Sequence, residues 1–244
     1  MKSSLRQFKM TNINFKNDMY SHGPLIITIG HKDTGKSVLV RDLLFYNQDI
    51  PFGTVISSSK SDEGFYSKFI PKSFIHDNYN SNIIDNIITR QILMIKQIIS
   101  DKKTKKENET DPRAFVILDN CFYDDKWTRG ESIRRLYMNG RSLNRLLVIT
   151  MQYPLGIPPV LRTNVDYVFI LRENIMSNQK HIYETYVTFT TFAAFCTILN
   201  GFTEDYECLV IDNNSKSDQL EDRIFWYRAE LHNDFRIGSK ELWE

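Results

Sequence analysis

The sequence predicts an α/β domain in which helices cover both faces of a central, mostly parallel sheet. Apolar strand-like runs alternate with amphipathic helical segments along the chain, which is the pattern of such sheets. A glycine-containing loop at 30–37 follows the first apolar run, and a later apolar run ends at Asp119. Both features would lie at the carboxyl ends of parallel strands, where sheets of this kind bind ligands.

The expected elements follow one another as in βαβ units. Isoleucines at steps of three and four predict one long amphipathic helix with a core stripe over 82–100. The segment 181–199 mixes aromatic and β-branched residues and fits either a helix or a strand. We expect strands over 25–29, 54–58, 114–118, 146–151, 165–171, 208–211 and 224–228, and helices over 36–46, 82–100 and 131–138.

Charged residues dominate the segment 101–113, with almost nothing apolar among them. Such a composition cannot bury much surface, so we expect a solvated loop here. Its lysines within 102–106 are one candidate for a contact with DNA.

Length and composition limit the class of protein. At 244 residues we expect one domain over 21–244 with a C-terminal elaboration, after an N-terminal extension over 1–20. The net charge of +1 gives no overall basic field for nucleic acid, although a local groove or a ring of subunits could bind phosphates. Three widely spaced cysteines argue against a disulfide framework or a zinc site. No apolar run is long enough to cross a bilayer, so the chain is not expected to be transmembrane.

The segment 30–37 fits the phosphate-binding loop, with one glycine at its start and another just before Lys36 and Ser37. Glycines let the backbone wrap phosphates with its N–H groups, and the following helix adds the positive end of its dipole. Lys36 would reach the β and γ phosphates, and the Ser37 hydroxyl would ligate Mg²⁺. The sequence therefore predicts a site for ATP, or another nucleoside triphosphate, with Mg²⁺. The expected contacts are Gly30, His31, Lys32, Asp33, Thr34, Gly35, Lys36, Ser37 and Val38.

Asp119 is the expected second anchor of the magnesium ion, because it ends a buried strand. The next residue is Asn120, at a position where motor ATPases usually carry an acid that orients the attacking water. An amide can hydrogen-bond water but cannot accept its proton, and positioning dominates in a loose transition state. Asn120 is therefore an orienting candidate, while Asp124, Asp125 and Glu173 stay open as sources of an acid.

Gln152 and two arginines complete the candidate site. Gln152 follows the strand 146–151, so its amide could sense the γ phosphate or its water. Arg141, at the turn before that strand, and Arg162 are candidates to reach the nucleotide of a neighbouring subunit. The alternative for both is a solvated surface arginine, which is the commoner case.

Taken together, these segments resemble the FtsK/HerA superfamily of ring-forming ATPases. They resemble more closely the genome-packaging ATPases of nucleocytoplasmic large DNA viruses, the group that includes poxviruses and mimivirus. The resemblance spans most of the chain and rests on 30–37, 116–121, 139–141, 150–158 and 161–169, of which the last three are the most specific.

The resemblance implies a RecA-like P-loop core of the ASCE type and a homo-oligomeric ring, a pentamer or hexamer, that hydrolyses ATP at subunit borders. It implies movement of double-stranded viral DNA into a preformed capsid, with capsid or virion membrane proteins as partners. The expected location is the viral factory of the host cytoplasm, or the virion. By position in the family pattern, Arg141 would be the finger and Gln152 the sensor, with Arg162 the second choice for the finger.

The chain departs from the family pattern at two positions. Asn120 stands where the second acid is usual, which bears on the rate of hydrolysis rather than on nucleotide binding. Ser142 stands where a histidine is frequent.

Two other functions remain open from the sequence. A P-loop kinase of a small acceptor would need an arginine-rich lid, which Arg129, Arg134 and Arg135 could supply. An ATP-gated scaffold for capsid assembly, with little turnover, is suggested by Asn120.

Overall fold

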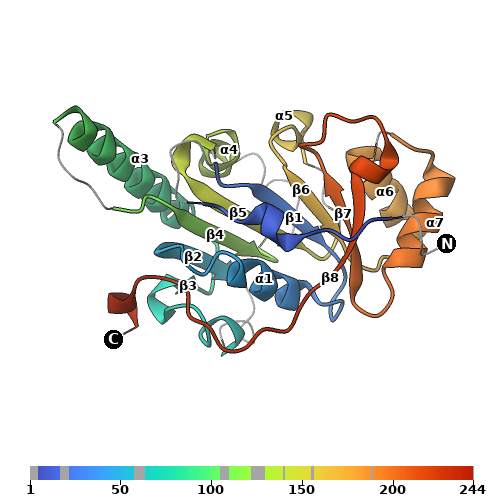
Figure 1. Cartoon of the computed structure of the whole chain (residues 1–244), viewed down its shortest axis with the longest axis horizontal. Coiled ribbons are helices and arrows are strands. Elements are labelled where there is room, and N and C mark those ends of the chain that lie inside the picture. The colour runs from blue at the N-terminus through green and yellow to red at the C-terminus, as the bar shows by residue number, and fades with distance from the viewer. Residues whose placement is uncertain are drawn as a thin grey trace.

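A mixed sheet with helices on both faces forms the core of the molecule (Figure 1). The computed structural model describes residues 5–16, 22–57, 64–104, 110–121, 130–139, 141–154, 157–187 and 189–243. The sheet has eight strands in the order β3-β2-β4-β5-β1-β6-β7-β8. The strands are β1 (Leu25–Ile29), β2 (Phe52–Ser57), β3 (Ile75–His76), β4 (Ala114–Asp119), β5 (Arg145–Met151), β6 (Tyr167–Ile170), β7 (Glu207–Asp212) and β8 (Ile224–Arg228). The predicted α/β class with a mostly parallel sheet is confirmed.

The six neighbouring strands β3, β2, β4, β5, β1 and β6 are all parallel to one another. At the β6 side of the sheet, β7 pairs antiparallel with β6, and β8 pairs antiparallel with β7. The parallel strands therefore share two edges. We call the edge at which they begin the amino edge and the edge at which they end the carboxyl edge. The central strands are buried along their whole length, as expected when helices cover both faces.

Helices lie on both faces of the sheet and build two hydrophobic clusters. One cluster includes Ile88, Leu136, Ile182 and Leu199 from four helices on one face. The other joins α1 to the opposite face. The α-helices are α1 (Lys36–Phe45), α3 (Ser81–Lys103), α4 (Glu131–Met138), α5 (Pro159–Arg162), α6 (Met176–Tyr186) and α7 (Phe192–Phe202). Short 3-10 helices are η1 (Met10–Ile13), η2 (Lys72–Phe74), η4 (Arg141–Leu143), η5 (Leu220–Asp222) and η6 (Lys240–Leu242).

Described segments near the two ends of the chain pack against the α1 side of the sheet. Phe8 and Phe15 of the N-terminal segment are buried there. The segment 229–243, which we call the C-terminal strap, runs past α1 toward β2 in Figure 1. Two main-chain hydrogen bonds hold it there. The Ile237 N–H donates to the Phe69 carbonyl at 3.0 Å, and the Gly238 N–H donates to the Ile50 carbonyl at 3.2 Å.

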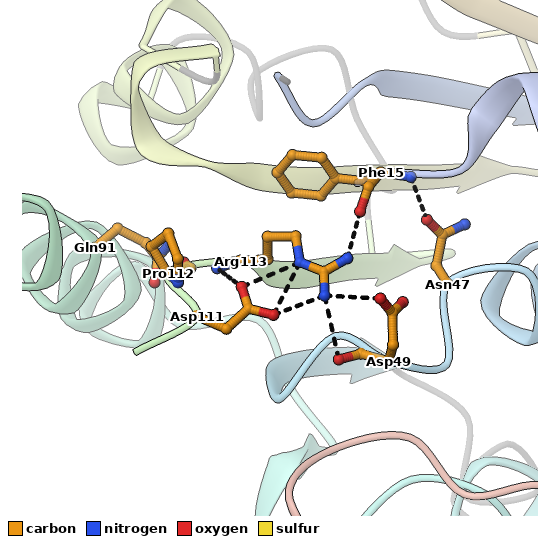
Figure 2. A network of polar contacts seen from close by, with 7 residues as sticks. All are labelled: Phe15, Asn47, Asp49, Gln91, Asp111, Pro112 and Arg113. Atoms are coloured by element: carbon orange, nitrogen blue, oxygen red, sulfur yellow. Dashed lines mark hydrogen bonds and ion pairs between the residues drawn. The ribbon is translucent and has the colours of Figure 1, made fainter. Parts of the chain in front are cut away.

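The expectation of a solvated loop over 101–113 is wrong at both ends. Helix α3 continues to Lys103, and Arg113 is only 4% exposed. Figure 2 shows the Arg113 guanidinium among the carboxylates of Asp49 and Asp111, at 2.8 and 2.6 Å. Charge density suggested solvation, but ion pairing lets this arginine be buried. Residues 105–109 lie outside the described part of the chain.

Most of the ambiguous segment 181–199 is helical, since α6 runs to Tyr186 and α7 begins at Phe192. Here the packing of Ile182, Phe195 and Leu199 into the core decides the structure over local β propensity. In the ranges that the structure describes, no helix combines the length and the apolar character needed to cross a membrane.

Candidate nucleotide-binding site

The loop between β1 and α1 has the geometry that a phosphate-binding loop requires. Gly35 has φ of 102° and Asp33 has φ of 63°, so two positions adopt the left-handed conformation. A Cβ on Gly30 would lie 2.6 Å from the Thr34 hydroxyl oxygen and 2.9 Å from the Leu171 Cβ, so a side chain there would clash. The loop is fixed at the carboxyl edge, where the Gly30 N–H donates to the Met151 carbonyl at 3.0 Å.

Lys36 points back into this loop. Its ammonium donates to the carbonyls of Gly30 and His31, each at 2.7 Å, and the residue is 9% exposed. Ser37 follows at the first turn of α1 and is half-buried. The Lys36 ammonium and the first turn of α1, which carries Ser37, therefore lie at the same loop, which is the arrangement that holds phosphate groups.

Asp119 lies at the same edge, at the end of β4. The register places it beside Thr150 of β5, and β5 in turn pairs with β1. The carboxylate accepts hydrogen bonds from the Tyr66 hydroxyl, at 2.7 Å, and from the Thr150 hydroxyl. These two donors fix the orientation of a carboxylate that is 3% exposed. Tyr66 and Thr150 are partners that sequence reasoning missed.

Asn120 and Gln152 follow the ends of neighbouring strands. Asn120 has φ of 50°, and its N–H donates to the Thr150 hydroxyl at 3.0 Å. Gln152 is exposed directly after Met151, the residue paired with Ile29 at the end of β1. The structure therefore brings Lys36, Asp119 and Gln152 to one edge, as the sequence predicted for strand ends.

Glu173 approaches the loop from its other side, after β6. Its carboxylate contacts the His31 ring at 3.0 Å and accepts from the Ile175 N–H at 2.7 Å and the Asn178 amide at 2.9 Å. The residue is 1% exposed. Glu173 thus ties the phosphate-binding loop to the start of α6. The other acids considered, Asp124 and Asp125, lie outside the described residues.

A cavity of about 720 Å³ adjoins the loop and the first turn of α1. Its wall includes Tyr206, which is 67% exposed, has φ of 65° and lies across the loop. A Cβ built on Gly35 would be 3.4 Å from the ring of Tyr206. The cavity is lined by Asp33, Gly35, Lys36, Ser37, Val38, Leu39, Leu171, Tyr206, Cys208, Arg228, Ala229 and Leu231.

Helix α1 is anchored to the C-terminal strap through Asp42, which is fully buried. Its carboxylate accepts from the Tyr227 hydroxyl at 2.6 Å and the Glu230 N–H at 3.1 Å, and contacts the His232 ring at 2.5 Å. The His232 ring also stacks on Phe45, with centroids 3.7 Å apart. Burial, followed by the Asp42 contact, raises the pKa of Tyr227, so this hydroxyl stays a donor. The strap therefore holds the helix that carries Lys36 and Ser37.

The two candidate finger arginines lie at the amino edge, opposite the loop. Arg141 begins η4, directly before β5, whose seven residues span about 20 Å. The side chain of Arg141 lies outside the described part. Arg162 ends α5, shortly before β6, and its Nη1 donates to the Thr185 carbonyl at 2.9 Å. Arg162 and the main chain of Arg141 therefore lie at the edge of the sheet opposite the phosphate-binding loop of their own chain.

The arginines considered for a kinase lid are placed differently. Arg135 of α4 pairs with Asp85 of α3, at 3.8 Å, on the flank of the sheet. Arg134 is exposed on the same helix, and Arg129 lies outside the described residues.

Solved structures share this fold. The genome packaging NTPase B204 from Sulfolobus turreted icosahedral virus 2, in complex with AMPPCP, aligns with a TM-score of 0.54 at 14% identity, over 86% of this chain and 99% of that chain. The pCW3 conjugation coupling protein TcpA, with ATPgS, aligns with a TM-score of 0.56 at 13% identity, over 93% of this chain and 69% of that chain. The fold is that of the RecA-like P-loop NTPases, and the loop between β1 and α1 has the geometry of a phosphate-binding loop.

Sequence relatives come from large DNA viruses. Protein L437 of Acanthamoeba polyphaga mimivirus is 36% identical over 224 residues, covering 90% of this chain and 77% of that protein. Protein 075L of Invertebrate iridescent virus 6 is 34% identical over 251 residues, covering 99% of this chain and 92% of that protein. No family model matches the chain. The chain belongs to the protein family that these mimivirus and iridescent virus proteins represent, and the resemblance predicted from the sequence is confirmed.

Proposed function

We propose that this protein is an ATP-driven motor that moves double-stranded viral DNA into a preformed capsid. The observation that carries the proposal is the convergence of Lys36, Ser37 and Asp119 at one edge of the sheet, beside a cavity large enough for a nucleoside. The likeness to the packaging NTPase B204, solved with AMPPCP, supports it.

In this proposal the triphosphate lies in the loop 30–37. The main-chain N–H groups of the loop and the Lys36 ammonium surround the β and γ phosphates. The base occupies the adjoining cavity. Tyr206 offers a ring on which a base can stack, and Leu171 and Leu231 give apolar walls. Val38 lies at the same first turn of α1.

Ser37 and Asp119 fit a magnesium ion, because a hydroxyl and a carboxylate are the hard oxygen donors this ion prefers. The Asp119 carboxylate is already oriented by Tyr66 and Thr150. When bound, the ion would neutralise charge on the phosphates.

Hydrolysis needs a positioned water and a cation at the transferring phosphate. Asn120 and Gln152 are the orienting groups for the water in our proposal. Arg141 from a neighbouring subunit supplies the cation, with Arg162 as the alternative. Since both arginines lie at the amino edge, a complete site requires a second copy of the chain, and a homo-oligomeric ring of five or six subunits satisfies this requirement.

The remaining parts of the proposal follow the family. The N-terminal extension over 1–20 and the single ATPase domain over 21–244 belong to one ring subunit. Docking relies on capsid or virion membrane proteins, and the site of action is the viral factory of the host cytoplasm, or the virion.

Phosphate release, measured with and without duplex DNA, tests the proposal. We expect ATP hydrolysis that duplex DNA stimulates, and displacement of a triplex-forming strand from linear DNA. Both activities should be lost in Lys36→Ala and kept in Lys180→Ala, a change at an exposed lysine of α6. Tight ATP binding without turnover on any DNA would indicate a scaffold instead, and phosphoryl transfer to an added nucleoside would indicate a kinase.

A further inference from the structure

Gln91 of α3 is a buried side chain that lies far from the nucleotide site. It is 0% exposed, and its amide nitrogen donates to the carbonyls of Pro112, Leu143 and Asn144 at 2.8, 2.7 and 3.3 Å. One amide thus joins the segment before β4 to the turn before β5. Leu143 is the last residue of η4, which begins at Arg141, and Asn144 follows it.

The orientation of this amide is set by its neighbour on α3. Arg90 donates to the Gln91 Oε1 at 2.5 Å, and its guanidinium lies 3.7 Å from the ring centroid of Phe52. Because Oε1 is engaged by a cation, the NH2 group must face the three carbonyls. A charged donor on one end of an amide also strengthens the bonds at the other end.

The Pro112 carbonyl is itself held in place by the Arg113 network, which Figure 2 shows next to Gln91. Asp111 accepts from the Arg113 main-chain N–H at 2.9 Å and pairs with its guanidinium. Arg113 also donates to the Phe15 carbonyl at 2.5 Å and pairs with Asp49. Gln91 therefore links two parts of the chain. One is the segment before β4, which the Arg113 network fixes, and the other is the end of η4.

From this arrangement we infer that Gln91 is the positioning residue for Arg141. The inference rests on the proposed function, in which Arg141 serves the nucleotide of a neighbouring subunit. Without the amide, the buried Leu143 carbonyl and the part-buried Pro112 carbonyl lose this donor, whereas the Asn144 carbonyl keeps the Ala114 N–H at 3.1 Å. The end of η4 would then shift to find a new partner for the Leu143 carbonyl. A displacement of about 1 Å in a group that stabilises the transition state can cost about 100-fold in rate.

Gln91→Met tests this inference, since it keeps the length of the side chain and removes the donor. We expect kcat for ATP to fall at least 10-fold while KM stays within about two-fold, because the loop 30–37 of the same chain is untouched. The matched control is Gln97→Met on the same helix, where the exposed amide donates to Asp101 at 2.8 Å; it should keep wild-type kcat.

Mixed rings separate positioning from general damage. Lys36→Ala subunits lack their own active loop but carry an intact Arg141, so mixing them with Gln91→Met subunits should restore turnover above the sum of the two alone. If Gln91→Met does not fold, Arg90→Met takes its place, with a smaller fall in kcat and the same restoration.

Several results would overturn the inference. They are a kcat of Gln91→Met within two-fold of wild type, a rise in KM that accounts for the loss, or no restoration in mixed rings. Wild-type protein without ATP turnover would overturn the proposed function and this inference with it. An active wild type with a fully active Gln91→Met overturns the inference alone.

Discussion

At the amino edge of the sheet the Arg113 guanidinium bonds to two carboxylates and two main-chain carbonyls, from residues 15, 49 and 111. At the carboxyl edge the Lys36 ammonium bonds to carbonyls of its own loop, beside a cavity of about 720 Å³. Both cations are buried. Arg113 bonds to carboxylates of the chain, and Lys36 lines a space that a ligand can enter. Buried charge therefore serves structure at one edge and, in our proposal, binding at the other.

The pKa of Arg113 reflects this pairing. Burial by itself lowers the pKa, but the hydrogen bonds and charges of Asp111 and Asp49 outweigh it, so the pKa is raised. Arg145, also at the amino edge, shows the other outcome, because burial lowers its pKa to about 9. A buried guanidinium thus keeps its ordinary charge state most securely where carboxylates surround it.

Replacing Lys36 at the carboxyl edge should abolish most ATP turnover and leave the stability of the fold nearly unchanged. Lys36→Ala removes the cation at the β and γ phosphates, and we expect ATP turnover to fall about 1,000-fold, the effect of losing a preorganised stabilising group. The midpoint of thermal unfolding should change little, because Lys36 lies at the first turn of α1 beside a cavity, outside both hydrophobic clusters. Turnover assays and calorimetry on the same preparation check both parts. A variant that keeps a tenth of wild-type turnover would contradict the role given to Lys36.

Replacing Arg113 at the amino edge should lower the stability of the fold and leave ATP binding nearly unchanged. Arg113→Ala leaves the Asp111 and Asp49 carboxylates without their cation, and we expect a loss of about 3 kcal/mol in the free energy of unfolding. Below the unfolding transition, the affinity for ATP should stay within about two-fold. Urea denaturation measures the first and fluorescence titration with a nucleotide analogue the second. The matched control is Arg134→Ala, an exposed arginine of α4, which should change stability by less than about 0.5 kcal/mol.

Much of this contrast was predictable, but only on the carboxyl-edge side. The loop 30–37 and Asp119 are read from local patterns, and strand ends necessarily meet at one edge of a parallel sheet. The Arg113–Asp49 pair, the Tyr66–Asp119 bond and the Tyr227–Asp42 bond join residues 64, 53 and 185 positions apart. Contacts between residues so far apart in the sequence cannot be predicted from the hydrophobic pattern within one segment.

The segment 101–113 shows how local composition misleads. Its charges suggested a solvated loop, yet the adjoining apolar run 114–118 was the signal that Arg113 enters the core with β4. Similarly, the aromatic and β-branched residues of 181–199 concealed two helices, because their packing against the sheet is a tertiary effect.

Replacing Tyr206, which lines the cavity at the carboxyl edge, should have a smaller effect, on the affinity for ATP. If the base stacks on this ring, Tyr206→Ala should weaken binding of ATP about 10-fold, since base–aromatic stacking contributes about 1–3 kcal/mol per base. Tyr206→Phe keeps the ring and should bind like wild type. Equal affinity for all three proteins in a calorimetric titration would place the base elsewhere.

The central claim is that a triphosphate with its divalent ion is held at the carboxyl edge, between the loop 30–37 and β4. A structure of the protein with Mg²⁺ and a non-hydrolysable ATP analogue tests this most directly. We predict the ion at about 2.1 Å from the Ser37 hydroxyl oxygen, with Asp119 bonded to it or to one of its waters, and the base in the cavity beside Tyr206. A triphosphate bound away from the loop, or an ion that neither Ser37 nor Asp119 approaches, would contradict the account.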